Sequence, residues 1–589
     1  MGDQWDLQEK VQYHSLHDDV KRAVVSAKKL EAALKEAKQR LETVTVEEIK
    51  TLILESQALL KEWYQAYEVA ICLTSYDTAD EQARQLLGEI NILAGLEQNC
   101  QTALDILVQL SSKLVEEVLQ DEEMIPVAPI IQMRLQQQAK KGNLEAEHAF
   151  KMVEGDGLHA WGDLYTAIAS KVVLHVDGQT IPAAKGVKTV YYGADRKERL
   201  VYFQKWKEGW EEQADLCAKA LNHIAGFRLQ VQNTRNSTAI MEDSFLQNRI
   251  EEKTVEVMWD TFSAKREPLL AYLRRKKQLL RADSICWSDQ FAPLPIANKN
   301  NTELSFQEAI GFIQQQLQSF SPEMADFVEH TYQSNWIDAG SKENKTIGAF
   351  CASFPKWKEP RIMMTFQHDL ASTGVLAHEL GHAYHYFHLY ELPMFLQNIP
   401  PTIAEISSTL TETIVMDAAL QKVESVEEKL QILNNLLIRD VGILLNGHVR
   451  YLFERSFYQK RQEKIVAVAQ LNELMVQAQK EAYGGILDNF EPAFWAALRH
   501  FYMTRMPFVH YPYTVAHLLS IGIYDFLKNK NNRSEQLKTI FKDASQLTIE
   551  ALGEKYFAVN LQEPIFWEQT LERLYANVHQ FLALSDDLV

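Results

Sequence analysis

The sequence predicts a mainly α-helical fold, and three observations support that class. Apolar residues recur at steps of three and four positions over long stretches, which is typical of amphipathic helices. Segments with a strand-like pattern are few and short. The chain has 589 residues, more than a single hydrophobic core accommodates, so we expect several subdomains.

The N-terminal part of the chain predicts long antiparallel helices. Residues 18–42 are rich in Ala, Leu, Lys and Glu, and similar patterns fill most of residues 47–120. The charged faces of these helices are most simply solvated surfaces. A coiled-coil face for a partner helix is the alternative interpretation.

Short strands are expected in two places. Residues 171–176 and 179–181 flank Asp177-Gly178, a pair that favours a tight turn, so we predict a hairpin there. Residues 348–354 and 361–366 form a second predicted pair. An edge strand of that pair could bind an extended peptide through main-chain hydrogen bonds, whereas a purely structural hairpin is the simpler interpretation.

The most informative motif is His-Glu-Leu-Gly-His at residues 378–382, within an apolar and aromatic run that predicts a buried helix. Residues four positions apart lie about 40° apart around a helix, so His378 and His382 can bind one zinc ion. Glu379 could then act as the general base on a water molecule activated by the metal. Gly381 costs the helix about 1 kcal/mol relative to Ala, so we expect a substrate or a neighbouring helix to approach closely there.

A catalytic zinc usually takes three protein ligands, and the sequence offers two candidates for the third. His388 lies six residues after His382, a known zinc-ligand interval, but this chain has His385 where that pattern requires Gly. If the helix continues, His388 points away from the metal. We therefore favour Glu405, which follows a predicted helix start. Glu412 shares its helix face and could accept a hydrogen bond from a ligand histidine, although two solvated glutamates are the alternative.

Composition limits the classes of partner and compartment. The formal net charge of −19 disfavours nucleic acid and anionic membranes as partners. No run of about 18 apolar residues predicts a membrane span, and residues 1–6 lack the features of a signal peptide. The five scattered cysteines form neither a disulfide framework nor a Cys-x-x-Cys metal site, and they predict a cytoplasmic location.

Three segments occur in an order typical of one peptidase family. They are Gly-Ala-Phe at residues 348–350, Leu-Ala-His-Glu-Leu-Gly-His at 376–382, and Ala-Glu-x-x-Ser-Thr-x-x-Glu at 404–412. With these segments the chain resembles the M3 family of zinc metallopeptidases, within it the oligoendopeptidase F branch. Further similar stretches extend the resemblance over nearly the whole chain, at residues 5–7, 220–228, 248–250 and 292–295.

The resemblance implies a fold and a domain organisation. The expected fold is a multi-helical body of two lobes that encloses a deep substrate channel, with a small β-sheet beside the zinc helix. Residues 1–195 would form an N-terminal helical lobe that includes the hairpin near residues 171–181. Residues 196–589 would form the catalytic domain, with the motif helix near residues 373–389.

The resemblance also implies an activity and a set of ligands. The expected enzyme is a zinc metalloendopeptidase that hydrolyses internal bonds of short oligopeptides. One Zn²⁺ per chain would be bound by His378, His382 and Glu405, with Glu379 as the general base. Folded proteins would not enter the channel.

Aromatic residues near the C-terminus are the expected substrate contacts. The resemblance assigns binding of substrate and of the oxyanion to His500, Tyr511 and Tyr513, with Tyr502 and His510 in reserve. Core packing is the alternative for such a segment. Hydroxyl and imidazole groups need partners when they are buried, which favours the assignment to a site.

The chain departs from the branch at two places. Val509 stands where Tyr is common, and His510 stands where the branch has no histidine. Ser372 occupies the position, six residues before the first zinc histidine, that is commonly acidic. Asp369 or Glu412 could supply the missing carboxylate.

Two other functions are compatible with these residues. A zinc carboxypeptidase could use the same helix and glutamate, and cleavage of C-terminally blocked peptides would distinguish the two enzymes. A non-catalytic peptide-binding protein is the other alternative. The sequence alone does not give the cleavage-site preference, the physiological peptide or the oligomeric state.

Overall fold

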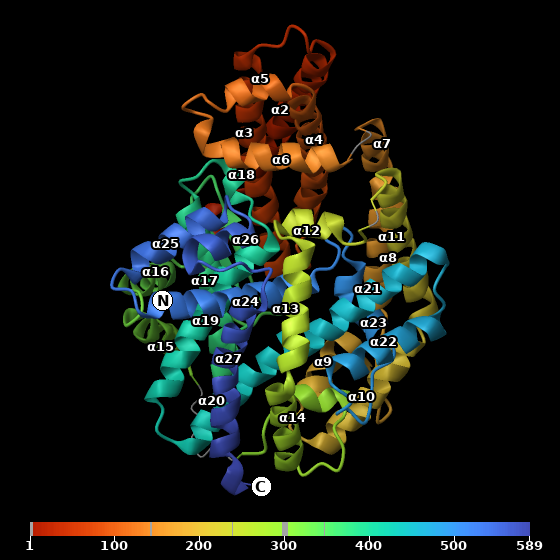
Figure 1. Ribbon diagram of the computed structural model, residues 1–589, viewed down its shortest axis with the longest axis vertical. Helices are drawn as coiled ribbons and strands as arrows, with labels where there is room; N and C mark the ends of the chain where they lie inside the picture. The colour runs from red at the N-terminus through yellow and green to blue at the C-terminus, as the bar shows by residue number, and fades with distance from the viewer. Residues whose placement is uncertain (1–3, 142–143, 238, 297–303, 347, 589) are drawn as a thin grey trace. The chain divides into compact units, whose positions relative to one another are not determined.

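The computed structural model describes residues 4–141, 144–237, 239–296, 304–346 and 348–588. Within these ranges the fold is mainly helical with small sheets, as predicted (Figure 1). Residues 1–3, which belong to the N-terminal segment expected to lack signal-peptide features, lie outside the described residues.

Contacts divide the chain into two compact units, and each unit is made of three segments. Unit 1 comprises Met1–Leu144, Thr302–Ala418 and Ile523–Leu552. Unit 2 comprises Glu145–Asn301, Ala419–Gly522 and Gly553–Val589. The division into an N-terminal lobe, residues 1–195, and a catalytic domain, residues 196–589, stays a prediction.

Unit 1 contains three long N-terminal helices, a small sheet and the helices that follow that sheet. Its helices are α1 (Leu7–Lys10), α2 (Tyr13–Gln39), α3 (Val46–Tyr76), α4 (Glu81–Leu110), α5 (Ser112–Val118), α6 (Ala128–Lys141), α15 (Phe306–Gln318), α16 (Pro322–Gln333), α17 (Leu370–Leu389), α18 (Met394–Gln397), α19 (Pro401–Lys422), α25 (Arg533–Ala544) and α26 (Ile549–Leu552). The last turn of α19 belongs to unit 2.

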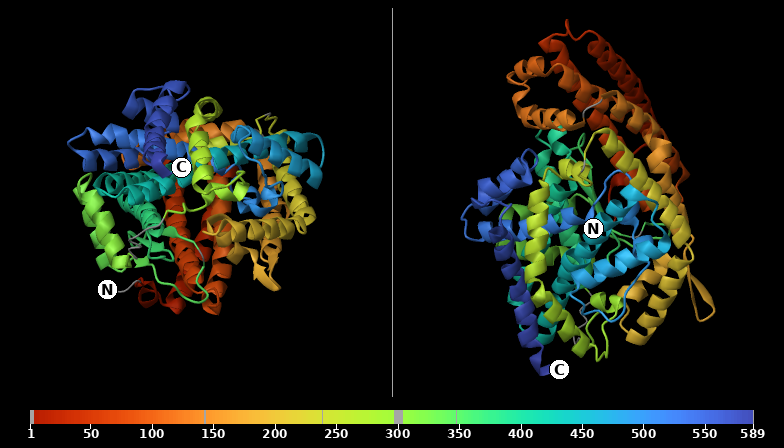
Figure 2. Two further views of the ribbon diagram at one scale, coloured as in Figure 1. Left: turned by 90° about the horizontal axis from the view of Figure 1, so that it is seen from below. Right: turned by 45° about the vertical axis from the view of Figure 1, so that its right-hand side comes forward.

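The helices α2, α3 and α4 pack side by side, as the N-terminal periodicity predicts (Figures 1 and 2). The apolar stripe of α2 is buried in their shared core, with Ala27 and Leu34 fully enclosed. Thr45 begins α3 with a capping box, because its side chain accepts from Glu48 N while the Glu48 carboxylate accepts from Thr45 N. Sequence-local caps and a continuous apolar stripe therefore build this bundle.

A three-stranded sheet in unit 1 supports the motif helix. Its strands are β3 (Ile337–Asp338), β4 (Phe350–Phe354) and β5 (Glu359–Met363), in the order β3-β5-β4. β4 runs antiparallel to β5 and lies at one edge, while β3 runs parallel to β5 at the other. The helix α17 packs against β4 and β5, so the predicted strand pair does lie beside the predicted helix.

Unit 2 is built almost entirely from helices. They are α7 (Leu144–Glu154, whose first residue lies in unit 1), α8 (Ala160–Ala169), α9 (Ala183–Tyr192), α10 (Arg196–Glu211), α11 (Ala214–Thr234), α12 (Glu242–Asn248), α13 (Glu252–Lys265), α14 (Glu267–Leu279), α20 (Val426–Asp440), α21 (Gly447–Glu463), α22 (Val468–Ala482), α23 (Phe494–Ala497), α24 (His510–Lys528, whose last residues lie in unit 1) and α27 (Pro564–Leu584).

The predicted hairpin is confirmed in unit 2. β1 (Val173–Val176) pairs antiparallel with β2 (Gln179–Pro182), and Val176 lies opposite Gln179. Asp177 and Gly178 form the turn with φ values of 49° and 77°, the left-handed conformation that this pair adopts readily.

Two further expectations concern the whole chain. All five cysteines are free thiols in the structure. In the part of the chain that the structure describes, no helix combines the length and the apolar character needed to cross a membrane.

Candidate metal centre

The motif helix α17 begins with a side-chain cap. Asp369 precedes the helix, and its Oδ1 accepts a hydrogen bond from Ser372 N at 2.7 Å. The Ser372 hydroxyl donates back to the Asp369 carbonyl oxygen at 3.0 Å. Asp369, one of the two residues proposed to supply the missing carboxylate, and Ser372, which occupies that position, therefore both take part in starting the helix.

Gly381 lets the backbone of α19 approach α17. A Cβ atom at Gly381 would lie 2.6 Å from the carbonyl oxygen of Ser407 and 2.7 Å from Cα of Ser408. The expectation that another element passes close to Gly381 is confirmed, and that element is the helix that carries Glu405.

Three side chains from α17 and α19 converge. Nε2 of His378 lies 3.3 Å from Oε2 of Glu405, and Nε2 of His382 lies 3.8 Å from the same oxygen. The two imidazole rings are 5.0 Å apart at an angle of 82°. One donor atom from each of the three residues lies within 4.8 Å of the others, and each residue is half-buried.

The electrostatics of this cluster favour a bound cation. Burial lowers the pKa of His378, but the neighbouring carboxylates of Glu405 and Glu412 outweigh burial and raise it to about 10. Burial raises the pKa of Glu405, but His382 and His378 lower it to about 2. Burial dominates at His382 and lowers its pKa to about 4. The site thus keeps Glu405 charged and His382 neutral, the forms that bind metal ions, whereas His378 would release a proton when a metal binds.

Glu379 lies next to this cluster and is 6% exposed. Burial raises the pKa of its carboxyl group to about 7. Among the described residues, its buried Oε2 has no hydrogen-bond partner. Because Oε2 makes no hydrogen bond that stabilises the fold, it is suited to accept a proton from a ligand.

Glu412 lies beside a proposed metal ligand, whereas His388 does not belong to the candidate site. Oε2 of Glu412 lies 3.7 Å from Nδ1 of His378, on the side of the ring away from Glu405. His388 stays on the continuing helix, and its ring packs against Tyr384 at 4.4 Å. His388 is not part of the metal-binding cluster found among the described residues.

The residues fit a divalent metal ion. Two imidazoles and one carboxylate are the donor set of catalytic zinc sites, and here all three point to one place from two packed helices. The partnerless oxygen of Glu379 is a second observation in favour of a ligand-binding site.

The predicted substrate contacts lie in unit 2, and they differ in accessibility. His500, in a 3-10 turn at Arg499–Tyr502, is half-buried. Tyr513, in the first turn of α24, is 40% exposed. Tyr511 is fully buried, and its hydroxyl accepts from Ser244 Oγ at 3.1 Å. Their roles stay predictions.

The two reserve residues are buried in the same unit. Tyr502 is 3% exposed, and its ring stacks on Tyr165 with centroids 3.6 Å apart. His510 is also 3% exposed, and its ring lies 5.2 Å from that of His500.

Sequence reasoning missed Arg450. Burial, and after it the positive charge of Arg450, lowers the pKa of both His500 and His510. Arg450 lies on α21 in unit 2. The signal that could have identified it is a lone charge in the otherwise uncharged run at residues 441–453.

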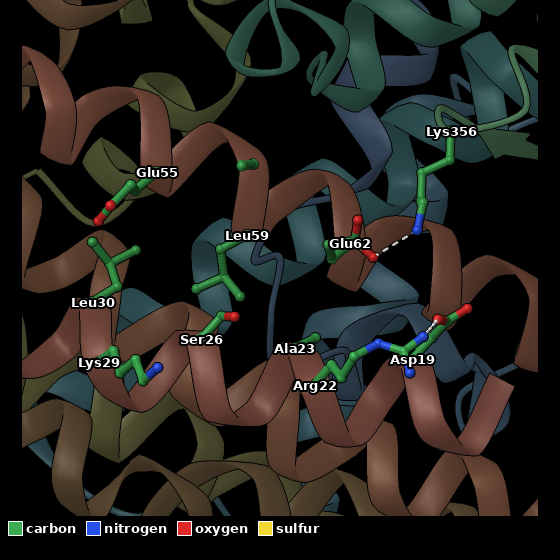
Figure 3. A pocket seen from close by; sticks show the side chains of 11 residues that line it. Asp19, Arg22, Ala23, Ser26, Lys29, Leu30, Glu55, Leu59, Glu62 and Lys356 are labelled. Atoms are coloured by element: carbon green, nitrogen blue, oxygen red, sulfur yellow. Dashed lines mark hydrogen bonds and ion pairs between the residues drawn. The ribbon is translucent and has the colours of Figure 1, made fainter. Parts of the chain in front are cut away.

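A cavity of about 590 Å³ lies in unit 1 between α2 and α3 (Figure 3). None of the predicted site residues lines it. Several of its charged groups are paired within the cavity wall: Lys356 Nζ donates to Glu62 Oε2 at 2.8 Å, and Arg22 pairs with Asp19. The cavity shows no set of converging functional groups comparable to those of α17 and α19.

One family description covers more than half of the chain. The sequence model of Peptidase family M3 matches residues 190–541. Oligopeptidase PepF of Bacillus subtilis (strain 168) is 24% identical over 330 residues, which cover 55% of this chain and 48% of that protein. The chain spans about half the length of the curated relatives it matches.

Solved structures share the fold over almost the full chain. A structure from Chlamydophila abortus covers 98% of both chains with a TM-score of 0.76 at 18% identity. Oligoendopeptidase-F from Enterococcus faecium covers 99% of both chains with a TM-score of 0.68 at 16% identity. At these identities the likeness concerns the fold alone.

Proposed function

Because the chain belongs to peptidase family M3, we propose that it is a zinc-dependent endopeptidase that hydrolyses internal bonds of short oligopeptides. The observation that carries this proposal is the convergence of His378, His382 and Glu405, whose donor atoms lie within 4.8 Å of one another beside the buried Glu379. Zinc bound by these three residues would act as a Lewis acid on the scissile carbonyl group and lower the pKa of water to about 7.

Glu379 is the proposed general base. Its partnerless Oε2 would take a proton from the attacking water and then deliver it to the leaving amine. The raised pKa of about 7 suits both steps, because a group with a pKa near neutrality can accept and release a proton at physiological pH.

Glu412 is the proposed orienting residue. Its carboxylate faces Nδ1 of His378, so it can accept the N–H of that ring and direct Nε2 toward the metal. This arrangement takes the place of the acidic residue for which the chain has Ser372, whose side chain is used in the helix cap.

The edge strand β4 is the proposed site for the peptide backbone. β4 pairs with β5 along one side only in the sheet order, and α17 packs on both strands. An extended peptide could add to the other side through main-chain hydrogen bonds, which do not depend on side-chain identity. That mode of binding would allow many different sequences to be cleaved.

Unit 2 contributes the proposed hydrogen-bond donors. His500, Tyr511 and Tyr513 are assigned to substrate and to the oxyanion on the resemblance to the family. Each donor to an oxyanion typically lowers the barrier by about 3 kcal/mol. Tyr513, with 40% of its surface exposed, is more accessible than Tyr511.

The proposal includes the compartment and the size of the substrate. Five free thiols favour a reducing cytoplasm. A restriction to short peptides is part of the proposal on the resemblance to the family.

The experiment combines metal analysis with cleavage of end-blocked quenched peptides of graded length, with and without chelator. We expect one zinc per chain and chelator-sensitive cleavage of short blocked peptides. Cleavage only of peptides with a free C-terminus would identify a carboxypeptidase. Binding without any cleavage by the zinc-loaded protein would identify a peptide-binding protein and overturn the proposal.

A further inference from the structure

Arg450 is a half-buried cation, and no carboxylate in the ranges that the structure describes pairs with it. It lies on α21 in unit 2 (Figure 1), and its Nε donates to Asn446 Oδ1 at 2.6 Å. Its guanidinium also lies over the ring of Phe494, 5.7 Å from the centroid. Among the described residues, no acceptor binds its two terminal amino groups and no carboxylate pairs with it.

The surroundings of Arg450 are aromatic rather than acidic. Burial lowers the pKa of its guanidinium to about 10, and the groups that act against burial are the phenols of Tyr483, Tyr191 and Tyr513, then Tyr192. The carboxyl group of Glu491 binds Tyr191, because it accepts from Tyr191 Oη at 2.9 Å, and it also accepts from Trp206 Nε1 at 2.7 Å.

Two histidines add hydrogen-bonding groups to this region. Both ring nitrogens of His510 are buried and without a partner among the described residues, and so is Nδ1 of His500. Burial, with the positive charge of Arg450, lowers the pKa of His500 to about 4 and the pKa of His510 well below its usual value. Both rings are therefore neutral at pH 7, and each carries one N–H that can donate.

Arg450 is half-buried, so its charge is partly removed from water, and a ligand of opposite charge offsets that cost. The planar guanidinium of arginine matches a carboxylate through two parallel hydrogen bonds. Neutral imidazoles can donate to the same anion. The arrangement is therefore suited to a carboxylate brought by a ligand.

We propose that Arg450, with His500 and His510, binds a carboxylate of the peptide substrate. The carboxylate is either the C-terminal group of the peptide or the side chain of an aspartate or glutamate. This inference rests on the proposed peptidase function and adds a class of preferred substrate to it.

The test uses the full chain and N-acetylated quenched peptides of one core sequence. One pair differs only in a C-terminal free acid or amide. A second set keeps the amide and replaces one residue at a time by Glu or by Gln. We expect one acid-to-amide pair or one Glu-to-Gln pair to differ by about tenfold to a hundredfold in kcat/KM, the usual range for a hydrogen-bonded charge.

Variants of two arginines on α21 test whether the carboxylate preference in kcat/KM depends on Arg450. Arg450→Gln should reduce the kcat/KM ratio between the carboxylate peptide and its uncharged counterpart to near one. Arg450→Lys keeps the positive charge but lacks the two parallel N–H donors of a guanidinium, so it should retain part of that ratio. Arg455→Gln is the control, because Arg455 is on the same helix, with its side chain 43% exposed and 3.9 Å from Glu256. It should keep the ratio of the natural chain.

The inference is overturned if no carboxylate improves kcat/KM in the natural chain, or if Arg450→Gln keeps the full preference. The first criterion needs no variant and holds even if Arg450→Gln does not fold. Fluorescence anisotropy with the Glu379→Gln chain, which should not cleave the peptides, measures the same carboxylate preference as a ratio of Kd values. A carboxylate preference in Kd that depends on Arg450, without any peptide cleavage by the natural chain, would reject the proposed function while supporting this binding site.

Discussion

Nδ1 of His378 lies 3.7 Å from Oε2 of Glu412, while Nε2 of the same ring faces Glu405 at 3.3 Å. The two glutamates are seven residues apart on α19 and thus share one face of the helix. The helix α19 therefore carries both Glu405, a proposed ligand, and Glu412, the proposed orienting group for His378. Their spacing along the helix sets their relative position.

We predict that Glu412→Gln weakens zinc binding by about tenfold to a hundredfold, because the charged acceptor for the His378 ring is lost. Competition titration with a chromogenic chelator measures this affinity. Glu424→Gln, an exposed position just after α19, should leave it unchanged. Equal affinities for the Glu412 variant and the natural chain would show that Glu412 does not support His378.

Glu379→Gln should retain zinc and lower kcat by about a hundredfold to ten-thousandfold, because the amide cannot take a proton from water. Elemental analysis and turnover of a blocked peptide test the two parts separately. Glu391→Gln is a suitable control, since Glu391 lies just beyond α17 on the surface and pairs with Lys542 at 3.4 Å. Substantial activity in the Glu379 variant would refute its role as base.

Glu405→Ala should lower the zinc content of purified protein, because only two of the three donors remain. The matched variant His388→Ala should bind zinc like the natural chain, since His388 packs against Tyr384 instead. Full zinc occupancy in Glu405→Ala combined with loss of zinc in His388→Ala would reverse the assignment of the third ligand.

Gly381→Ala should destabilise the fold by about 1–3 kcal/mol, as expected for overpacking between two helices. The new Cβ would meet the backbone of Ser407 and Ser408, which cannot move without shifting the helix that carries Glu405. We therefore also expect weaker zinc binding.

Gly311→Ala is the control for this substitution. Gly311 lies within α15, and nothing lies within 4 Å of a Cβ atom placed there. That change should stabilise the protein by up to about 1 kcal/mol, because alanine is the better helix former. Denaturant unfolding of both variants makes the comparison, and equal effects would contradict the close approach at Gly381.

Glu491 should make the stability of the protein depend on pH. Burial raises the pKa of its carboxyl group from 4.5 to about 7, against the hydrogen bonds from Tyr191 and Trp206. The folded state therefore favours the protonated form. The contribution of this group to stability is fully present below pH 4.5 and is lost as the pH rises through 7.

The matching variant is Glu491→Gln, which keeps the shape and does not ionise. Relative to it, the natural chain should lose on the order of 3 kcal/mol of unfolding free energy between pH 4.5 and pH 7.5. Denaturant unfolding at several pH values measures the difference. A constant difference between the two chains across this range would contradict a raised pKa at Glu491.

Much of the fold could be predicted from local patterns. The spacing of apolar residues in α2 and α3 indicated long helices, and Asp177-Gly178 indicated the hairpin turn. These features depend on residues close together in the chain, so periodicity and turn chemistry are sufficient. The interleaving of three segments in each unit could not be predicted in that way, because it depends on contacts between residues hundreds of positions apart.

The candidate site shows the same division. The sequence by itself determined the candidate donors His378, His382 and Glu405, because helical spacing brings the first two together and the sequence offers few candidates for the third. Only the tertiary structure decided that Glu412 rather than Asp369 faces His378, and that no carboxylate in the described part of the chain pairs with Arg450. The physical reason is that spacing places residues on one helix, whereas the packing of separate segments decides which charges meet and which stay unpaired.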